Sequence, residues 1–412
     1  MRTITFIFLL LVFSCSYGQT KYQKDFDYYW KTINDNFAYF DIQKTDWSKV
    51  KAFYQPLVDT ITNNDTFVHL LENINNELYN GHISLNTNLP SSNRLIPTGA
   101  DLWVKYQRKQ FIITAIREGF GAERSGLKHG MTITHYHGEP MDSAVQDFLP
   151  KSVSFHDERM YEYAANMLLA GRHNTKRSIT ALWNGIERTY YPDNSVNKIV
   201  SDYSKVIEYR RMPFRIGYIK INNSLGNNAL IKAFDEALDS LQNTKGLILD
   251  LRETPSGGNT TVARAMMSRF IEKELPYQKH SLPNEEKQYG VRRSWIELVS
   301  PGEKTYKKPV VILVNRWTGS MGEGIAIGFD GMNRAVIIGD KMAGLLGAIY
   351  SFTLPETKIG FSIPVEKLFH LNGTPRENFT PKFLVSESEN YLPLATKLLT
   401  IKSTAANTAV PK

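Results

Sequence analysis

The sequence of 412 residues contains a single cysteine, Cys15, which lies within the first eighteen residues. A mature chain without this segment has no thiol, which excludes disulfides, a cysteine nucleophile and a cysteine-ligated metal site. Stability must then come from burial of apolar side chains, and a hydrophobic content of 42% is ample for this. The length predicts two or three domains.

Long hydrophobic runs are also missing, apart from the first thirteen residues, which are too short to span a bilayer. This run follows a single positive charge and precedes Ser16 and Gly18, small residues at the positions that a signal peptidase reads. We therefore expect residues 1–18 to be a secretory signal, and the protein to be periplasmic, at the cell surface or secreted. A lipid anchor at Cys15 remains an alternative, because residues 12–15 loosely resemble a lipid-attachment box in which Phe13 fits poorly.

Basic clusters with interleaved aromatic residues are absent, although the net charge is +8. The densest basic groups, at residues 210–215 and 304–308, each enclose one aromatic residue, which is too little for a stacking platform. This pattern predicts a solvated surface and no nucleic-acid partner. The glycine-rich turn at Gly257-Gly258 lacks the Gly-Lys-Ser/Thr of a phosphate-binding loop, so a phosphate cradle is disfavoured.

Hydrophobic periodicity divides the remaining chain into three regions. Residues 19–95 are rich in aromatics at helical spacing and predict an N-terminal helical subdomain. Residues 96–195 predict short strands, at 102–106, 111–116 and 178–183. From 200 to 402, strand and helix signals alternate, which predicts a layered α/β core. Residues 272–308 interrupt it without strong periodicity, and we interpret them as a long loop that serves as a lid or cleft wall.

The most informative stretch is Asn315-Arg-Trp-Thr-Gly-Ser-Met-Gly-Glu-Gly324, which follows the apolar run Val310 to Val314. A buried strand, a turn that only small side chains permit and a helix would present the Ser320 hydroxyl at a helix N-terminus. Free backbone N–H groups there favour a developing oxyanion. We expect the N–H groups of Gly258 and Met321 to form the oxyanion hole. The alternative is that Ser320 merely caps the helix.

Two resemblances extend this interpretation. Gly121-Ala-Glu-Arg-Ser-Gly-Leu127, with glycines 130 and 138 after it, resembles a PDZ domain, a family that binds chain ends as an added strand. The whole chain resembles the S41 peptidases, C-terminal-processing and tricorn-type serine proteases. The markers are Gly217-Tyr-Ile, Leu249-Asp-Leu-Arg252, the Ser320 turn, Ile338-Gly-Asp340 and Gly373-Thr-Pro-Arg-Glu-Asn378. The resemblance implies an α/β fold with a crotonase/ClpP-like core, an N-terminal helical subdomain and a PDZ-like β-rich domain.

The resemblance also implies the general base. In the processing-protease branch a lysine activates the serine, but Leu345 occupies its position here, and Lys341 does not match it. In the tricorn-like branch the base is a histidine after a Glu-Leu-x-x-Ser-His pattern, which matches Glu77-Leu-Tyr-Asn-Gly-His82. An imidazole suits proton removal from serine. The alternative is a structural histidine.

Glu377 matches the glutamate that completes the tricorn-like site, and we expect it to steady the His82 imidazolium directly or through water. Its alternative is a surface-loop carboxylate. Gly81 replaces the family's serine, whose orienting hydroxyl is therefore absent, and Ser84 is a candidate substitute. His370 is the fallback base, and we expect Glu323 to support the turn rather than to react.

These observations predict an exported serine endopeptidase with catalytic Ser320, His82 and Glu377, acting on polypeptides through an acyl-enzyme, without metal or organic cofactor. One alternative is a catalytically idle binding protein that keeps the fold. Another is an acyl-CoA enzyme of crotonase type, against which the export signal and PDZ-like region argue. The sequence predicts neither the oligomeric state nor the cleavage preference.

Overall fold

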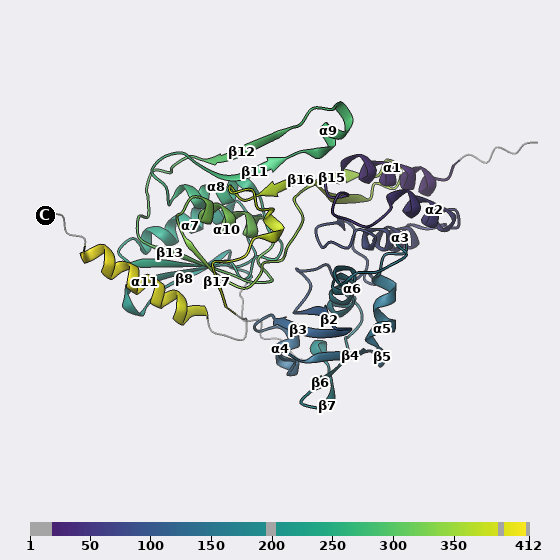
Figure 1. Ribbon diagram of the computed structural model, residues 1–412, viewed down its shortest axis with the longest axis horizontal. Coiled ribbons are helices and arrows are strands. Elements are labelled where there is room, and N and C mark those ends of the chain that lie inside the picture. Colours follow the sequence, from purple (N-terminus) through teal and green to yellow (C-terminus); the bar gives the residue numbers. More distant parts are fainter. Residues whose placement is uncertain (1–18, 195–202, 386–390, 409–412) are drawn as a thin grey trace, which may run out of the picture.

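The computed structural model describes residues 19–194, 203–385 and 391–408, and the predicted signal with Cys15 lies outside these ranges. The chain has a mixed α/β fold in which helices, a β-rich module and an α/β core follow one another (Figure 1). Within the described ranges, no helix combines the length and hydropathy needed to cross a membrane.

Three helices form the N-terminal region, as the aromatic periodicity predicts: α1 (Lys21–Asn36), α2 (Trp47–Val58) and α3 (Asn64–Asn76). Each begins at a residue whose side chain accepts hydrogen bonds from the first turn, namely Thr20, Asp46 and Asn63. Their buried faces share one cluster with strand residues such as Phe361 and Ile363 of the core. The helices therefore pack on the core instead of standing apart from it.

The β-rich module contains a six-stranded sheet in the order β2-β3-β4-β6-β7, with β5 paired to β4. Its strands are β2 (Leu102–Gln107), β3 (Gln110–Ile116), β4 (Thr132–Tyr136), β5 (Glu139–Pro140), β6 (Ile179–Trp183) and β7 (Ile186–Tyr190). Its short helices are α4 (Gly121–Ser125), α5 (Met141–Ala144) and the 3-10 turns Val145–Phe148 and Pro192–Asn194. The sequence analysis assigned no helix α6 (Glu158–Ala170), which Asp157 caps and whose apolar face packs on this sheet.

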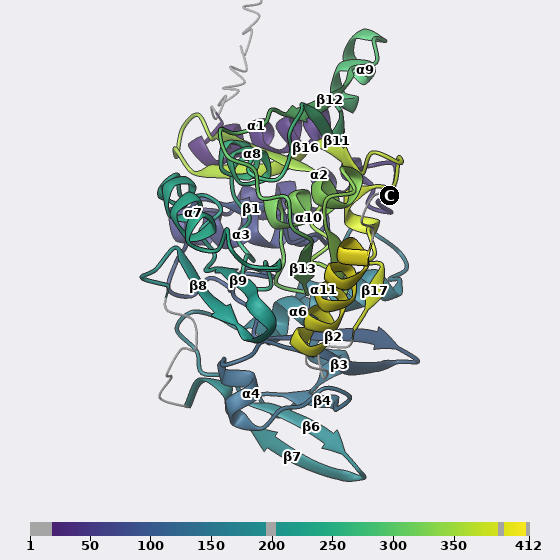
Figure 2. The ribbon, with the colours of Figure 1, turned by 90° about the vertical axis from the view of Figure 1, so that its left-hand side faces the viewer.

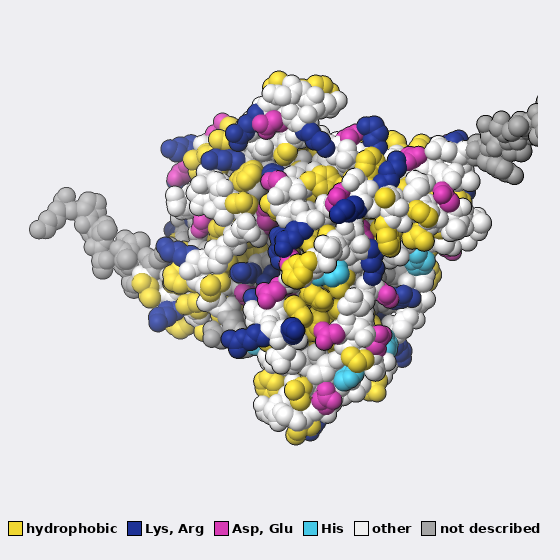
Figure 3. Space-filling model, turned by 45° about the vertical axis from the view of Figure 1, so that its right-hand side comes forward, with side chains coloured by type: hydrophobic (Ala, Val, Ile, Leu, Met, Phe, Trp, Pro, Cys, Tyr) yellow, Lys and Arg dark blue, Asp and Glu magenta, His cyan; other side chains and the backbone are white. Residues whose placement is uncertain are grey.

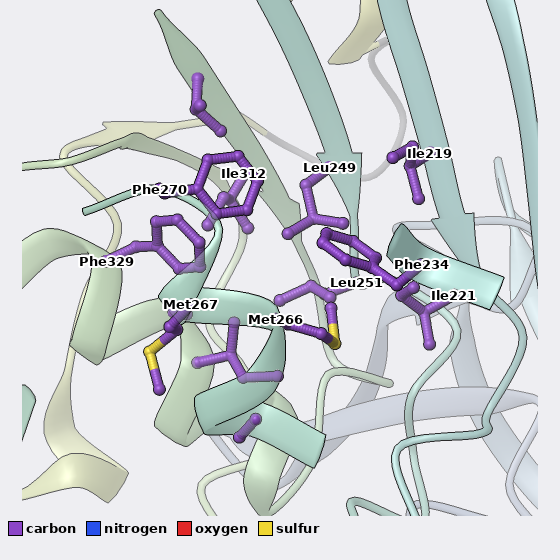
Figure 4. Packing of buried hydrophobic residues seen from close by; sticks show 14 of the residues in the cluster. Ile219, Ile221, Phe234, Leu249, Leu251, Met266, Met267, Phe270, Ile312 and Phe329 are labelled. Atoms are coloured by element: carbon purple, nitrogen blue, oxygen red, sulfur yellow. The ribbon is translucent and has the colours of Figure 1, made fainter. Parts of the chain in front are cut away.

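The core sheet has the order β17-β14-β13-β10-β9-β8, and all neighbours are parallel except β8 and β9. Its strands are β8 (Ile207–Met212), β9 (Ile216–Ile221), β10 (Gly246–Asp250), β13 (Val310–Val314), β14 (Val336–Gly339) and β17 (Phe383–Leu384). Helices α7 (Ala229–Ser240), α8 (Thr260–Ser268) and α10 (Met321–Gly331) cover one face. Figure 4 shows Phe234, Phe270 and Phe329 packed against strand residues there.

The other face of the core sheet packs on α11 (Tyr391–Thr408), a helix that the sequence analysis did not assign (Figure 2). Successive residues of β10 alternate between the two faces: Leu247 and Leu249 lie in the cluster of α7, α8 and α10, whereas Ile248 lies in the cluster of α11. Burial on both sides explains why β10 and β13 read as continuous apolar runs.

A second sheet has the order β1-β16-β11-β12, with β15 paired to β16. Its strands are β1 (Ser84–Leu85), β11 (Leu275–Ser281), β12 (Ser294–Val299), β15 (Ala348–Thr353) and β16 (Gly360–Phe369). The prediction of an unstructured loop over 272–308 was wrong, because β11, α9 (Pro283–Tyr289) and β12 form an arm there. Exposed apolar residues on β12 obscure its strand pattern. The arm contacts α1 through the bonds Asn284–Asn36 and Lys287–Asn34.

Charges of both signs are interspersed over the surface that Figure 3 displays, with basic side chains in dark blue and acidic ones in magenta. The view agrees with the dispersed basic residues that the sequence analysis noted.

Candidate active site

Ser320 lies where β13 turns into α10, as the sequence predicts. Its backbone has φ 51° and ψ −109°, a region that residues other than glycine rarely occupy. Such a conformation costs about 1–3 kcal/mol and persists only where the surroundings enforce it. Here the Ser320 N–H donates to Glu323 Oε2 over 2.8 Å, which ties the turn to the first turn of α10.

His82 faces Ser320 from the segment between α3 and β1. Its Nε2 lies 3.1 Å from Ser320 Oγ, and its Nδ1 lies 2.6 Å from the backbone oxygen of Leu346. A carbonyl oxygen only accepts, so Nδ1 carries the proton and Nε2 of the neutral ring presents a lone pair to the hydroxyl. Burial and, to a smaller extent, the Arg376 charge lower the pKa of His82 to about 4, so the ring is neutral at pH 7.

The loop of residues 344–347 connects the two partners. Glu323 accepts from the N–H groups of Gly344 (2.9 Å) and Leu345 (3.3 Å) in addition to Ser320. Arg376, which is only 1% exposed, donates to the oxygens of Leu345 (2.9 Å) and Gly347 (2.8 Å). These bonds fix the residues on both sides of Leu346. They therefore also fix the Leu346 carbonyl, which accepts the hydrogen bond from the His82 ring.

Glu323 and Arg376 are themselves a buried pair, with Oε2 and Nη2 4.0 Å apart. Burial raises the pKa of Glu323 to about 7, and Arg376 and the three N–H donors oppose that shift. The expected supporting role of Glu323 agrees with these bonds. The sequence analysis did not single out Arg376 or Leu346. Nothing local marks an arginine as buried, and a backbone acceptor has no side-chain signature.

No hydrogen bond joins Glu377 to the imidazole among the described residues. Of the two expected routes, direct or through water, the direct one is therefore not seen, and the route through water stays a prediction. The Leu346 carbonyl occupies Nδ1. Glu377 lines a small cavity of about 110 Å³, together with Glu323, Arg376 and Lys341. Its Oε2 is buried without a hydrogen-bond partner in the described part of the chain, and burial raises its pKa.

The two glycines of the 250–258 turn have different roles. A Cβ on Gly257, whose φ is 64°, would lie 2.3 Å from Ser320 Cβ, so this glycine lets the turn approach the serine. A Cβ on Gly258 would lie 2.1 Å from the carbonyl of Leu225. The N–H groups of Gly258 and Met321 have no acceptor among the described residues, so both remain available to a ligand oxygen.

Gly81 leaves no room for the serine hydroxyl found in tricorn-type relatives. A Cβ there would lie 2.4 Å from the backbone oxygen of Ile96. Ser84, the candidate substitute, lies in β1 opposite Ser362 of β16 and makes no bond to His82. The imidazole is therefore oriented by a backbone carbonyl in place of a hydroxyl.

The other positions at which the family or the sequence could place a base lie away from the Ser320 hydroxyl. Leu345, at the lysine position, is buried beside the turn, and its Cδ1 would lie 3.3 Å from a Cβ at Gly319. Lys341 is exposed on the small cavity. His370 has Nε2 3.3 Å from Asp330 Oδ2 and accepts from the N–H of Asn372 at Nδ1. Neither Lys341 nor His370 bonds to Ser320.

The β-rich module contacts both turns that build the site. Trp317, three residues before the serine, donates from Nε1 to the oxygen of Ala100 over 2.8 Å. Arg117 forms a buried ion pair with Glu253 of the 250–258 turn, at 2.9 Å. Movement of the module would therefore act on the Ser320 turn and on the glycine turn together.

Comparison with known proteins shows similarity to S41 and tricorn-type proteases. The model of peptidase family S41 matches residues 215–383, and the model of the tricorn protease C1 domain matches residues 19–75. The carboxyl-terminal-processing protease of Synechocystis sp. is 24% identical over 348 residues, which cover 82% of this chain and 74% of that protein.

Solved structures share the fold at low identity. The photosystem II D1 C-terminal processing protease has a TM-score of 0.56 at 17% identity, covering 92% of this chain and 98% of its own. Mature CPAF has a TM-score of 0.61 at 12% identity, covering 94% and 98%. The family models and the curated relative are thus S41 or tricorn-type proteases, and the chain is a serine-type peptidase.

Proposed function

We propose that the protein hydrolyses peptide bonds with Ser320 as nucleophile and His82 as general base. The observation that carries the proposal is the 3.1 Å separation of Ser320 Oγ and His82 Nε2, with the Nδ1 proton held by Leu346. A base must reach the proton that it removes, and this distance is within hydrogen-bond reach.

In the proposed reaction, Ser320 Oγ attacks the peptide carbonyl carbon while its proton passes to His82 Nε2. The carbonyl oxygen takes up the negative charge between the N–H groups of Gly258 and Met321. His82 then returns the proton to the leaving amine as the C–N bond breaks, which leaves an acyl-enzyme. Water, deprotonated by His82, attacks the ester and releases the carboxylic acid and the free serine.

Arg376, Glu323 and Glu377 support this pair without touching the substrate. Arg376 and Glu323 set the 344–347 loop, and with it the carbonyl that fixes the tautomer of His82. We assign Glu377 an indirect part, through water or through the charge balance around Arg376. Nothing in the proposed steps requires a metal or organic cofactor.

The finer architecture belongs to the same proposal. We infer a crotonase/ClpP-like core over residues 200–402, a PDZ-like domain over 96–195 and a helical subdomain over 19–95. The parallel core sheet, the antiparallel sheet of the module and helices α1–α3 support this division. The substrate is polypeptide. We also propose export to the periplasm, cell surface or medium after removal of residues 1–18, with a lipid anchor at Cys15 as the alternative.

Hydrolysis of fluorescein-labelled casein tests the proposal. The unaltered protein should release dye-labelled peptides, and Ser320→Ala should lower kcat/KM by at least about 10³-fold. Ser143→Ala, a change at an exposed serine of the β-rich module, should match the unaltered protein. Equal rates for Ser320→Ala and the unaltered protein would refute the role of Ser320.

A catalytically idle binding protein is the second candidate, because the imidazole lacks a carboxylate partner at Nδ1. That candidate predicts binding of unfolded polypeptide with no turnover by any variant. The acyl-CoA alternative predicts retention on immobilised CoA, whereas the peptidase proposal predicts none.

A further inference from the structure

A large cavity lies between the N-terminal helices and the β-rich module. Its volume is about 680 Å³, within the range of ligand sites in proteins. The walls come from α2, α3, the segment of residues 81–96, residues 147–151 and the end of α6. Neither Ser320 nor His82 lines it, so it is distinct from the candidate active site.

Two buried asparagines at the end of α3 line this cavity. Asn75 and Asn76 are 7% and 6% exposed. Asn75 Oδ1 accepts from the Tyr29 hydroxyl, and Asn76 Oδ1 accepts from the Tyr163 hydroxyl over 3.1 Å. The amide nitrogens have no acceptor in the described part of the chain. Neither nitrogen is among the fully buried polar atoms without a partner, so both are reached from the cavity and can donate to an acceptor that a ligand brings.

The chemistry of the lining selects among ligand classes. Two acidic side chains, Glu72 and Asp147, balance two basic ones, Lys151 and Arg172, so the cavity has no excess charge for a nucleotide or other anion. The rest of the lining includes further carboxamide and apolar side chains, among them Asn73, Asn86, Leu57, Leu95 and Phe148. A carboxamide presents one donor group and one acceptor, which matches the peptide group. Uncharged polar and apolar side chains fit a polypeptide segment best.

The cavity lies directly behind the residue that serves as base. Gly81, Ile83 and Leu85 line it, whereas His82, between the first two, turns to Ser320. Residues 80–83 form a turn closed by the bond from the Ile83 N–H to the Asn80 oxygen, and the His82 side chain leaves this turn toward Ser320. A chain bound in the cavity would contact the residues on both sides of His82, while its scissile bond lies on the other side of the segment.

We propose that this cavity is an exosite for an extended, uncharged segment of the polypeptide substrate, remote from the bond that is cleaved. The inference rests on the proposed function for its substrate class. It assigns a use to a cavity of mixed polar and apolar lining that the catalytic steps do not use. A consequence is that long unfolded substrates bind more tightly than short peptides that fill only the active site.

Binding of fluorescein-labelled β-casein to the Ser320→Ala protein, measured by anisotropy, tests the exosite without turnover. Asn73→Trp and Thr87→Trp would fill the cavity from its lining and leave the Tyr29 and Tyr163 bonds intact. Each should raise Kd at least about fivefold, whereas Thr62→Trp, exposed and outside the lining, should stay within about twofold. Unchanged Kd in both folded filling variants, or no saturable binding to Ser320→Ala, would overturn the exosite.

Hydrogen exchange gives a second measurement that needs no cavity variant. Addition of β-casein to Ser320→Ala should slow exchange in α3 and in residues 86–96, and no slowing there would overturn the proposal. The outcome is separate from that of the proposed function. Casein that binds through the cavity but is never hydrolysed by the unaltered protein would refute the peptidase mechanism alone, and hydrolysis without any cavity effect would refute the exosite alone.

Discussion

Ser320 Oγ and His82 Nε2 lie 3.1 Å apart although 238 positions separate the two residues in the chain. Pairing of β1 with β16 brings the segment after His82 onto the core, with Ser84 opposite Ser362 and Leu85 opposite Phe361. The Leu346 carbonyl then holds the far side of the ring. The pair is thus assembled by the packing of the N-terminal helices on the core, and five predictions follow from the way it is held.

Backbone strain at Ser320 should be measurable as a difference in the free energy of unfolding between two variants. Glycine adopts φ 51° without a Cβ clash, whereas alanine does not. Ser320→Gly should therefore have a free energy of unfolding about 1 kcal/mol higher than Ser320→Ala, after allowance for the greater entropy of unfolded glycine. Urea unfolding of the two inactive variants compares them directly. An alanine variant at least as stable as the glycine variant would show that the turn is unstrained.

The low pKa of His82 predicts activity that persists into acid. Burial lowers this pKa to about 4, and only the neutral ring accepts the Ser320 proton, so kcat/KM should fall by half near pH 4 and change little between pH 8 and 5. The measurement is the pH profile of peptide hydrolysis, with circular dichroism to establish folding. A loss centred near 6.5, the ordinary histidine value, would contradict the burial account.

The same shift has a consequence for stability. Unfolded His82 binds a proton below about pH 6.5 and folded His82 only below about 4, so its contribution to stability is present above 6.5 and falls as the pH drops between these values. Glu323, whose pKa is raised from 4.5 to about 7, acts in the opposite direction, because the folded state binds its proton more tightly and stability falls as the pH rises from about 4.5 to 7. The His82 effect should therefore be seen most clearly in Glu323→Gln, where this opposing contribution is absent.

Arg376 should act through both geometry and charge. Arg376→Met removes two carbonyl bonds and the cation that lowers the His82 pKa, so kcat/KM should fall at least about tenfold and the acid limb should move to higher pH. Arg376→Lys keeps the charge and should keep the acid limb near that of the unaltered protein, with a smaller loss of kcat. Identical pH profiles for the two variants would contradict the effect of the Arg376 charge on His82, whatever their loss of stability.

Gly81 should tolerate no side chain. A Cβ would lie 2.4 Å from the Ile96 oxygen, so Gly81→Ala should lower the free energy of unfolding by about 1–3 kcal/mol and reduce kcat by displacing His82. Gly226→Ala is the matched control, because its Cβ would meet nothing closer than 3.9 Å, and stability should change by at most about 0.5 kcal/mol. Chemical denaturation of both variants measures the difference. Equal stability of the two variants would show that the Ile96 oxygen moves away from a Cβ at residue 81 at little cost in free energy.

The sequence predicts those parts of the fold that repeat a local pattern. Val310 to Val314 and the glycines around Ser320 indicate the strand, turn and helix that the structure contains. His82 is different, since no local pattern links it to a serine 238 positions away, and only a family motif suggested the pair. Arg376 and the Leu346 carbonyl act through burial and backbone geometry, which a residue's identity does not reveal. The β11–α9–β12 arm was missed because its edge strand exposes Ile296 and Leu298, and the usual alternation is lost.

The most direct test of the central claim is labelling by a fluorophosphonate probe, with the modified residue located by mass spectrometry. Covalent attachment to Ser320 in the unaltered protein and in Lys341→Ala, with labelling lost in Ser320→Ala and slowed at least about 10²-fold in His82→Ala, is the predicted result. Undiminished labelling of Ser320 in His82→Ala would contradict the assignment of the base, and no labelling of the folded protein between pH 6 and 8 would contradict the nucleophile itself.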